Sequence, residues 1–125
     1  MKIKCNQVLI LNDAVKKVLD EQDAQTRIKK RQYFFTLREA AVEAEKERDN
    51  VRKRFADEAG RVPQDKIPWA NAALETALSA EVELDIDVDK AAFTQEQLIK
   101  ANALEDVLTT LERYDLISNK TKEKK

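Results

Sequence analysis

Residues 81–89 read EVELDIDVD, a run in which acidic and aliphatic side chains alternate without a break. A period of two places each set on its own face of an extended strand, whereas a helix would scatter both sets around its circumference. The stretch therefore predicts a strand with one apolar face and one acidic face. The acidic face consists of Glu81, Glu83, Asp85, Asp87 and Asp89.

Residues 1–5, MKIKC, alternate in the same way but carry the opposite charge, at Lys2 and Lys4. Because the rest of the chain has helical periodicity, we expect these residues to supply the hydrogen-bonding partner that the acidic strand needs. Pairing would set lysines opposite carboxylates, at about 0.2–1 kcal/mol per pair, and would turn Ile3 to the same apolar face as Leu84. The sequence leaves the strand direction open.

Four further segments have apolar residues at helical spacing, and we expect each to form a helix. They cover residues 7–20, 26–60, 68–80 and 95–114. Gly60, the only glycine, suits a left-handed C-terminal cap, Pro68 suits a first helical turn, and Thr94 suits an N-cap. The expected fold class is mostly α, a long helix packed on shorter helices, with a small two-stranded β element made by residues 1–5 and 81–89.

The composition is typical of one helical domain, since 38% of the 125 residues are charged and the chain has one glycine and two prolines. We assign residues 1–118 to this domain and expect a disordered basic tail at residues 119–125. Residues 1–61 hold 15 basic and 11 acidic side chains, a net charge of +4, whereas residues 62–125 hold 8 and 13, a net charge of −5. Such a chain can satisfy its charges within one molecule or between copies.

A heptad seam runs along the predicted helix of residues 26–60. Its members, spaced by three and four residues, are Phe34, Leu37, Ala41, Ala44, Arg48, Val51 and Phe55. The alanines would let another helix approach closely, and Arg48 must reach outward or meet an acid. At 1.5 Å per residue the helix would be about 50 Å long, beyond the roughly 35 Å of a compact domain of this size. We therefore expect it to project or to be covered by several shorter helices.

Catalytic chemistry has little support in the composition. The chain has no histidine, two serines and no glycine-rich phosphate loop. Cys5 is the only cysteine, so an internal disulfide cannot form, and the longest aliphatic run is too short for a signal or a membrane span. We expect a soluble, cytoplasmic protein without cofactor or small-molecule substrate, and not an enzyme.

Asp85, Asp87, Asp89 and Glu96 stand at positions 1, 3, 5 and 12 of an EF-hand-like spacing. Lys90 occupies the position at which the calcium loop wants glycine, and strand-forming aliphatic residues separate the acids. We therefore expect no metal site there. We interpret the acids as the solvated face of a strand, paired with Lys2 and Lys4 of the neighbouring strand.

A basic segment covers residues 27–38, where aromatic and cationic side chains are mixed without an acid. Its cations are Arg27, Lys29, Lys30, Arg31 and Arg38, and its aromatic residues are Tyr33, Phe34 and Phe35. Such a mixture can bind nucleic acid, but no recognised binding motif accompanies it. We expect the aromatic residues to belong to the core and the cations to pair with acids of the second half. Trp69 is expected to anchor its helix on the long one.

The order of these features resembles small, uncharacterised helical-hairpin proteins of tailed bacteriophages and prophages. The stretch NAALETALSAEVELDID, residues 71–87, carries the resemblance, and residues 74–87 are its specific part. Ala77, Ser79 and Ala80 depart from the leucine-rich form of that family. The resemblance implies a phage context, in the host cytoplasm or the virion, and no chemistry, because the family has no established activity.

The function we expect is non-enzymatic protein–protein interaction or assembly, virion-associated or assembly-assisting, with self-association into a homo-oligomer. The candidate surface combines the acidic face with Lys29, Lys30, Arg31 and Arg48. The alternative is an inhibitor of a host nucleic-acid enzyme, in which carboxylates about 6.7 Å apart on the strand of residues 81–89 mimic phosphates. Direct nucleic-acid binding through residues 27–38 is the third hypothesis.

Overall fold

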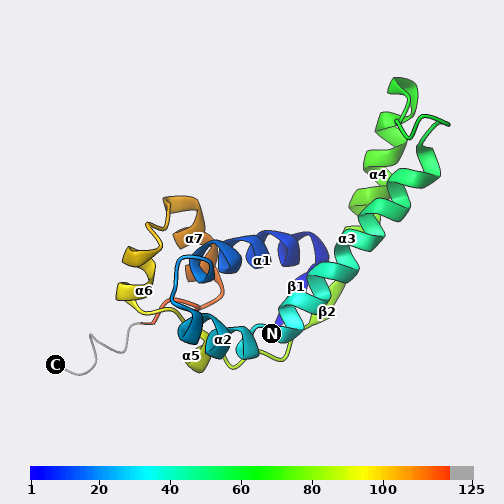
Figure 1. Cartoon of the computed structure of the whole chain (residues 1–125). Coiled ribbons are helices and arrows are strands. Elements are labelled where there is room, and N and C mark those ends of the chain that lie inside the picture. The colour runs from blue at the N-terminus through cyan, green and yellow to red at the C-terminus, as the bar shows by residue number, and fades with distance from the viewer. Residues whose placement is uncertain (119–125) are drawn as a thin grey trace.

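Two short strands, β1 (Lys2–Lys4) and β2 (Glu81–Glu83), pair where the projecting part of the molecule meets the rest (Figure 1). The structure is a computed structural model and describes residues 1–118. The strands run antiparallel, so the predicted pairing is confirmed and its direction is now known. The register opposes Lys2 to Glu83, Ile3 to Val82 and Lys4 to Glu81. The expected fold class, mostly α with a small two-stranded sheet, is confirmed as well.

The strand predicted over residues 81–89 is wrong from Leu84 onward. In the antiparallel register the ladder ends where the N–H of Leu84 donates to the carbonyl of Met1 at 2.7 Å. Asp85 is held instead by Thr36, which donates to its backbone carbonyl at 3.2 Å. The two-faced pattern nevertheless continues, since Leu84 is 3% exposed while Asp85 faces solvent. At Asp87 the chain turns into a short helix.

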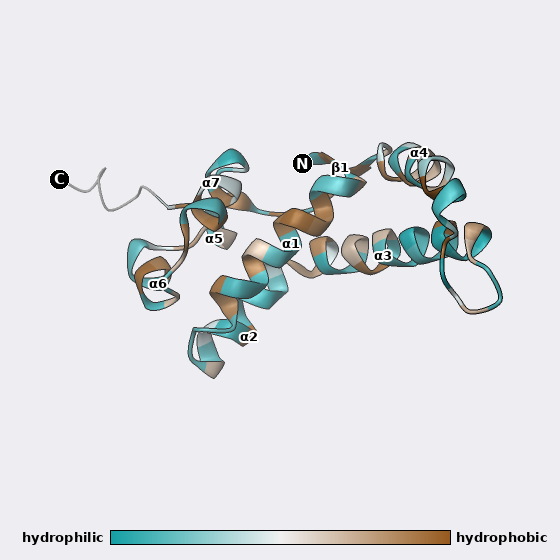
Figure 2. Ribbon diagram, turned by 90° about the horizontal axis from the view of Figure 1, so that it is seen from above, coloured by the Kyte–Doolittle hydropathy of each residue, from teal (hydrophilic) through white to brown (hydrophobic). Residues whose placement is uncertain are grey.

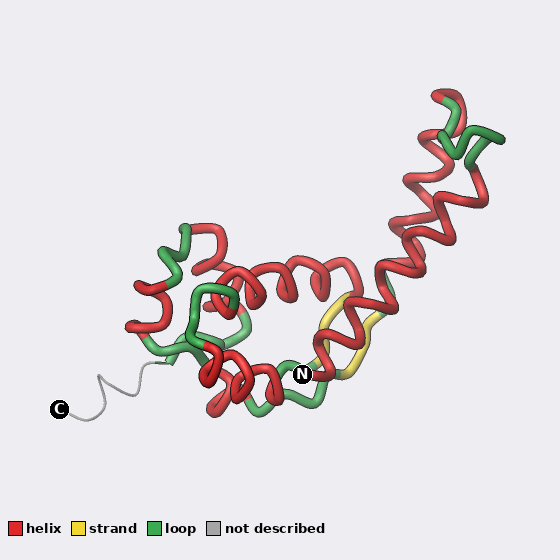
Figure 3. The backbone as a smooth tube through the Cα atoms, in the orientation of Figure 1, coloured by secondary structure: helices red, strands yellow, loops and turns green. Residues whose placement is uncertain are grey.

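Helices make up most of the remaining chain (Figure 3). The body of the molecule contains α1 (Cys5–Leu19), α2 (Ala24–Tyr33), α5 (Val88–Ala91), α6 (Gln95–Lys100) and α7 (Glu105–Arg113). α3 (Phe35–Phe55) starts in the body, leaves it, and returns through the short η1 (Gln64–Lys66) into α4 (Ile67–Leu78). The outer half of α3 and α4 lie side by side and form an arm, residues 44–78, that projects from the body (Figure 1).

Phe93 lies at the centre of the body. Its side chain is fully buried among apolar residues of α1, α3 and α7. Its backbone N–H donates to the carbonyl of Leu116 at 2.8 Å, and its carbonyl accepts from the N–H of Ser118 at 2.8 Å. These two bonds tie the last described residues to the body.

The long helix predicted over residues 26–60 is divided at Phe34 and ends at Phe55. Phe34 has φ −108° and ψ 14°, outside the helical region. Its buried ring stacks on that of Phe93, with 5.7 Å between centroids, and the change of direction lets α2 contact α5. The prediction was wrong because no glycine or proline marks the break, which depends on packing against residues distant in the sequence.

Gly60 adopts the predicted left-handed conformation, with φ 81°, but it caps no helix. α3 ends at Phe55, five residues earlier, and Ala56 is extended. Gly60 instead belongs to the loop at the tip of the arm, where its N–H donates to the carbonyl of Asp57 at 3.0 Å. The Asp57 carboxylate accepts two further backbone N–H groups and fixes the same loop.

The helix predicted over residues 95–114 is also divided, into α6 and α7. Thr94 caps α6 as predicted, through a capping box with Gln97. α6 ends at Lys100, and the chain turns at Asn102, which has φ 49°, a left-handed conformation that asparagine tolerates better than most residues. After the break, Leu104 is exposed to solvent.

The heptad seam is buried as predicted along most of its length, but its partners belong to the same chain. In the inner part, Leu37 and Ala41 join the core beside α1. In the outer part, Ala44 and Val51 are buried where α3 packs on α4. The helices of the arm meet through few large side chains, and much of α3 in this region is hydrophilic along its length (Figure 2).

Replacing Leu84 by alanine should lower the free energy of unfolding by about 2–4 kcal/mol, because the side chain is buried in the core and its loss leaves a cavity. Asp85→Ala, one residue along on the exposed face, should change it by less than about 0.5 kcal/mol. Urea denaturation monitored by circular dichroism measures both. Equal effects would contradict a stretch with one buried and one solvated face.

Asp23 caps α2, because its side chain accepts the N–H of Thr26 at 2.8 Å. This hydrogen bond to the backbone lowers the pKa of the carboxyl from its ordinary value of 3.8. A lowered pKa in the folded state adds stability above the unfolded pKa that is lost as pH falls through the folded value. Asp23→Ala should therefore lower the melting temperature near neutral pH, and its difference from the unaltered protein should shrink in acid. A difference that grew in acid would contradict this role.

Candidate protein-interaction surfaces

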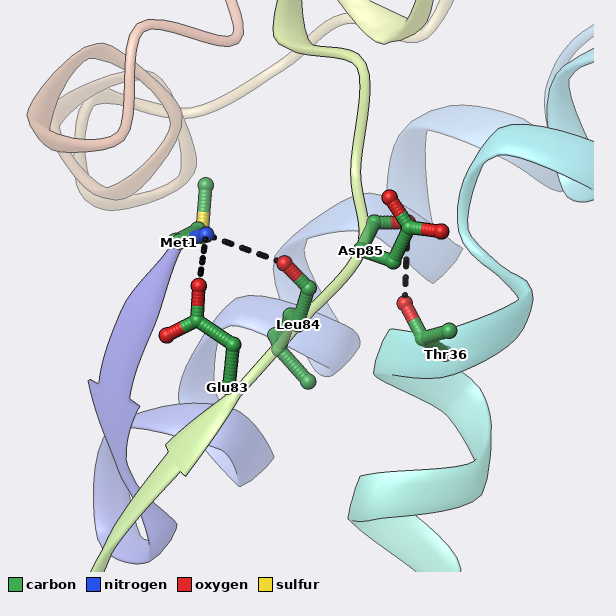
Figure 4. Close-up of polar contacts among 5 residues, drawn as sticks. All are labelled: Met1, Thr36, Glu83, Leu84 and Asp85. Atoms are coloured by element: carbon green, nitrogen blue, oxygen red, sulfur yellow. Dashed lines mark hydrogen bonds and ion pairs between the residues drawn. The ribbon is translucent and has the colours of Figure 1, made fainter.

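The acidic face begins beside the lysines of β1. Glu83 and Glu81 lie opposite Lys2 and Lys4 in the sheet, and the terminal ammonium of Met1 contacts the Glu83 carboxylate at 3.3 Å (Figure 4). The same ammonium donates to the carbonyl of Leu84 at 2.9 Å. Each carboxylate in the strand part of the acidic face therefore has a lysine opposite it in the sheet.

Beyond the sheet, the acidic face loses its regular spacing. Thr36 in the first turn of α3 donates to the backbone carbonyl of Asp85 at 3.2 Å and holds the extended segment (Figure 4). Asp87 accepts the N–H of Lys90 and caps α5, and Asp89 lies within that helix. The even repeat of about 6.7 Å needs an extended chain and ends at Asp87. A phosphate-mimic role would need five evenly spaced carboxylates, and the short helix at Val88–Ala91 interrupts that spacing.

Lys30 of the basic segment binds backbone carbonyls. Its ammonium donates to the carbonyls of Lys90, Ala91 and Ala92 at 3.1, 3.3 and 2.6 Å, and lies 5.6 Å from the ring centroid of Phe93. These carbonyls end α5, so the cation compensates the negative end of a helix. We infer that Lys30 stabilises the body, although the sequence suggested an interaction surface.

Three other cations of the segment, Lys29, Arg31 and Arg38, are exposed. Lys29 and Arg31 make no ion pair within residues 1–118, although pairing with acids of the second half was expected. Phe34 is in the core as predicted, but Phe35 is 61% exposed. Arg31 and Phe35 line a groove of about 410 Å³ between α1, α2 and α3. The sequence did not predict this groove because three separate helices form it.

Arg48, the charged member of the seam, lies at the inner end of the arm. It is half-buried, and its Nε atom has no hydrogen-bond partner within the described chain. It makes no ion pair with an acid in residues 1–118.

Trp69 lies at the outer end of the arm and is 70% exposed, so its expected role as an anchor on the long helix is wrong. The buried residues of α4 are Ala70 and Leu78, so these two side chains and not the tryptophan form the buried part of the contact. It borders an open groove of about 540 Å³. The groove is also lined by Arg54 and Phe55 of α3 and by small residues of α4.

Comparison with known proteins assigns no family: no family model, curated protein or solved structure matches the chain. Among the helices of residues 1–118, none has the length and apolar content needed to cross a bilayer. In the same residues, cysteine and acidic side chains do not gather into a cluster of three that could hold a metal ion.

Replacing Lys30 by methionine should lower the free energy of unfolding by about 1.5–3 kcal/mol, the range for hydrogen bonds to charged groups. Lys29→Met, which removes an exposed cation from the preceding position, should change it by less than about 0.5 kcal/mol. Chemical denaturation of the two variants makes the comparison. If both variants are as stable as the unaltered protein, Lys30 does not have the structural role inferred from its contacts.

Proposed function

We propose that the protein is a non-enzymatic protein-binding protein that presents the tip of its arm to a partner protein. The observation that carries the proposal is the exposure of Trp69, 70%, at the end of a projecting helical hairpin. Tryptophan is enriched among the few residues that dominate binding energy at interfaces. A tryptophan side chain that remains exposed to water contributes little to the stability of the fold.

The surroundings of Trp69 support a contact surface. Ile67 is also exposed, and Phe55 and Arg54 line the same groove from the neighbouring helix. Aromatic residues and arginine are the residue types that interfaces favour over lysine and glutamate. The tip is free of the body, so a partner can reach it without displacing any other element (Figure 1).

The heptad seam does not provide a surface for self-association. Leu37, Ala41, Ala44 and Val51 are buried against helices of the same chain. A coiled coil between copies through these residues would require the arm or the body to open. We therefore assign the binding role to the tip of the arm.

The biological setting of the proposal comes from the resemblance of residues 74–87 to helical-hairpin proteins of tailed phages and prophages. That resemblance supports a role in a virion or in its assembly, with the partner among the proteins present there. A reaction is not part of the proposal, in line with the lack of histidine and of a phosphate-binding loop.

Trp69→Ala should weaken binding to the partner by about 2 kcal/mol or more, roughly 30-fold, with little change in stability because the side chain is exposed. The partner is first identified by affinity purification and mass spectrometry, and its affinity is then measured by calorimetry. Ile99→Ala on α6, which removes a side chain that is 76% exposed, is the matched control and should bind normally.

The chain has one tryptophan, so its fluorescence gives a second measurement. Emission from Trp69 should shift to shorter wavelength when the partner covers the ring. Normal affinity of Trp69→Ala together with an unshifted emission would disprove binding at the tip.

A further inference from the structure

The groove between α1, α2 and α3 has an apolar floor. Val15 and Leu19 of α1, together with Phe34 and Ala41, line it and are buried. Its volume of about 410 Å³ lies within the range of sites that accept a ligand or the side chains of a partner. None of the residues that we assigned to the tip of the arm takes part in it.

The edge of the groove is apolar as well. Phe35 and Val42 of α3, 61% and 45% exposed, both line it. They are seven residues apart, about two helical turns or 10 Å, so they lie on the same side of α3. An apolar floor bordered by exposed apolar residues two turns apart matches the way grooves receive amphipathic helices, whose anchors repeat at the same interval. A small ligand on the floor would leave both edge residues in water.

Each of the three helices contributes one cation to the groove. Lys16 comes from α1, Arg31 from α2 and Arg38 from α3. None of the three makes an ion pair in the part of the chain that the structure describes. The acids that line the groove are Asp20 and Glu45, and residues 24–38 contain no acid at all. The wall formed by α2 and the start of α3 is therefore positive.

We propose that this groove binds an amphipathic helix of a protein partner whose apolar face is flanked by glutamate or aspartate. The apolar face would cover Phe35 and Val42, and the flanking carboxylates would meet Arg31 and Arg38. Both residues are arginines, which bind carboxylates through two parallel hydrogen bonds. The groove is separate from the arm and would give the molecule a second binding surface.

The two surfaces lie toward opposite ends of α3. Phe35 begins the helix and Phe55 ends it, and 21 helical residues span about 30 Å. A partner at the groove and another at the tip can therefore be bound together without contact between them. A protein with this arrangement could connect two components of an assembly.

The test uses a fluorescein-labelled synthetic helical peptide with leucine and phenylalanine on one face and glutamate on its flanks. A second peptide keeps the apolar face and has lysine on the flanks. In fluorescence anisotropy the glutamate peptide should bind the whole protein, and the lysine peptide should bind about tenfold or more weakly. Failure of the glutamate peptide to bind, or equal binding of the two peptides, would overturn the proposal.

Variants of the protein locate the site. Phe35→Ala and Arg38→Glu should each weaken binding of the glutamate peptide about tenfold, and Arg38→Glu should gain affinity for the lysine peptide. Lys29→Glu, a charge reversal on α2 outside the groove, is the matched control and should keep most of the affinity. Unchanged binding of Arg38→Glu, or a loss equal to that of Lys29→Glu, would overturn the assignment.

Trp69 separates this proposal from the proposed function. Binding in the groove should leave the tryptophan emission unchanged, and Trp69→Ala should bind the glutamate peptide with normal affinity. Loss of peptide binding in Trp69→Ala would place the peptide on the arm and would disprove a separate site.

Discussion

The antiparallel pairing of β1 with β2 is the constraint on which the rest of the structure depends. It joins the beginning of the chain to the residues that follow α4, more than seventy positions later. α1 starts directly after β1, and β2 follows two residues after α4, so this one pairing places both the body and the base of the arm. Ile3 and Leu84 complete the connection, because both side chains enter the core from the same face.

The sequence predicted those features whose signal is local and periodic. Alternation over residues 81–89 identified the strand, and the lysines of residues 1–5 identified its partner, because opposite charges face each other in the sheet. A helix cap was predictable where a side chain forms a hydrogen bond with the backbone of the helix that follows it, as at Thr94. The division of the helix at Phe34 had no such signal, since it depends on stacking with Phe93 and on the contacts of Lys30. The break near Asn102 could have been predicted, because asparagine tolerates the left-handed conformation found there. The helical spacing of the apolar residues around it favoured a continuous helix instead.

The candidate surfaces were predicted less well than the fold, and the reason is geometric. The basic segment was visible in the sequence, but its members separate in space: Lys30 turns to the body and Arg31 to a groove. Trp69 was expected to anchor its helix on the long one, whereas the buried residues of α4 are Ala70 and Leu78. Three helices form the groove, and the way they cross decides which residues line it. The sequence of any one helix does not contain that information.

The contact between α3 and α4 buries less apolar surface than the core of the body, so the arm and the body differ in local stability. Val51 is the one fully buried large side chain of this contact, and small residues such as Ala44 and Ala70 fill most of the remainder. Cooperative units with so little apolar contact open at a fraction of the global free energy of unfolding. Amide protons of the outer hairpin should accordingly exchange with deuterium well before those around Phe93, and the hairpin can adjust its shape without disturbing the rest.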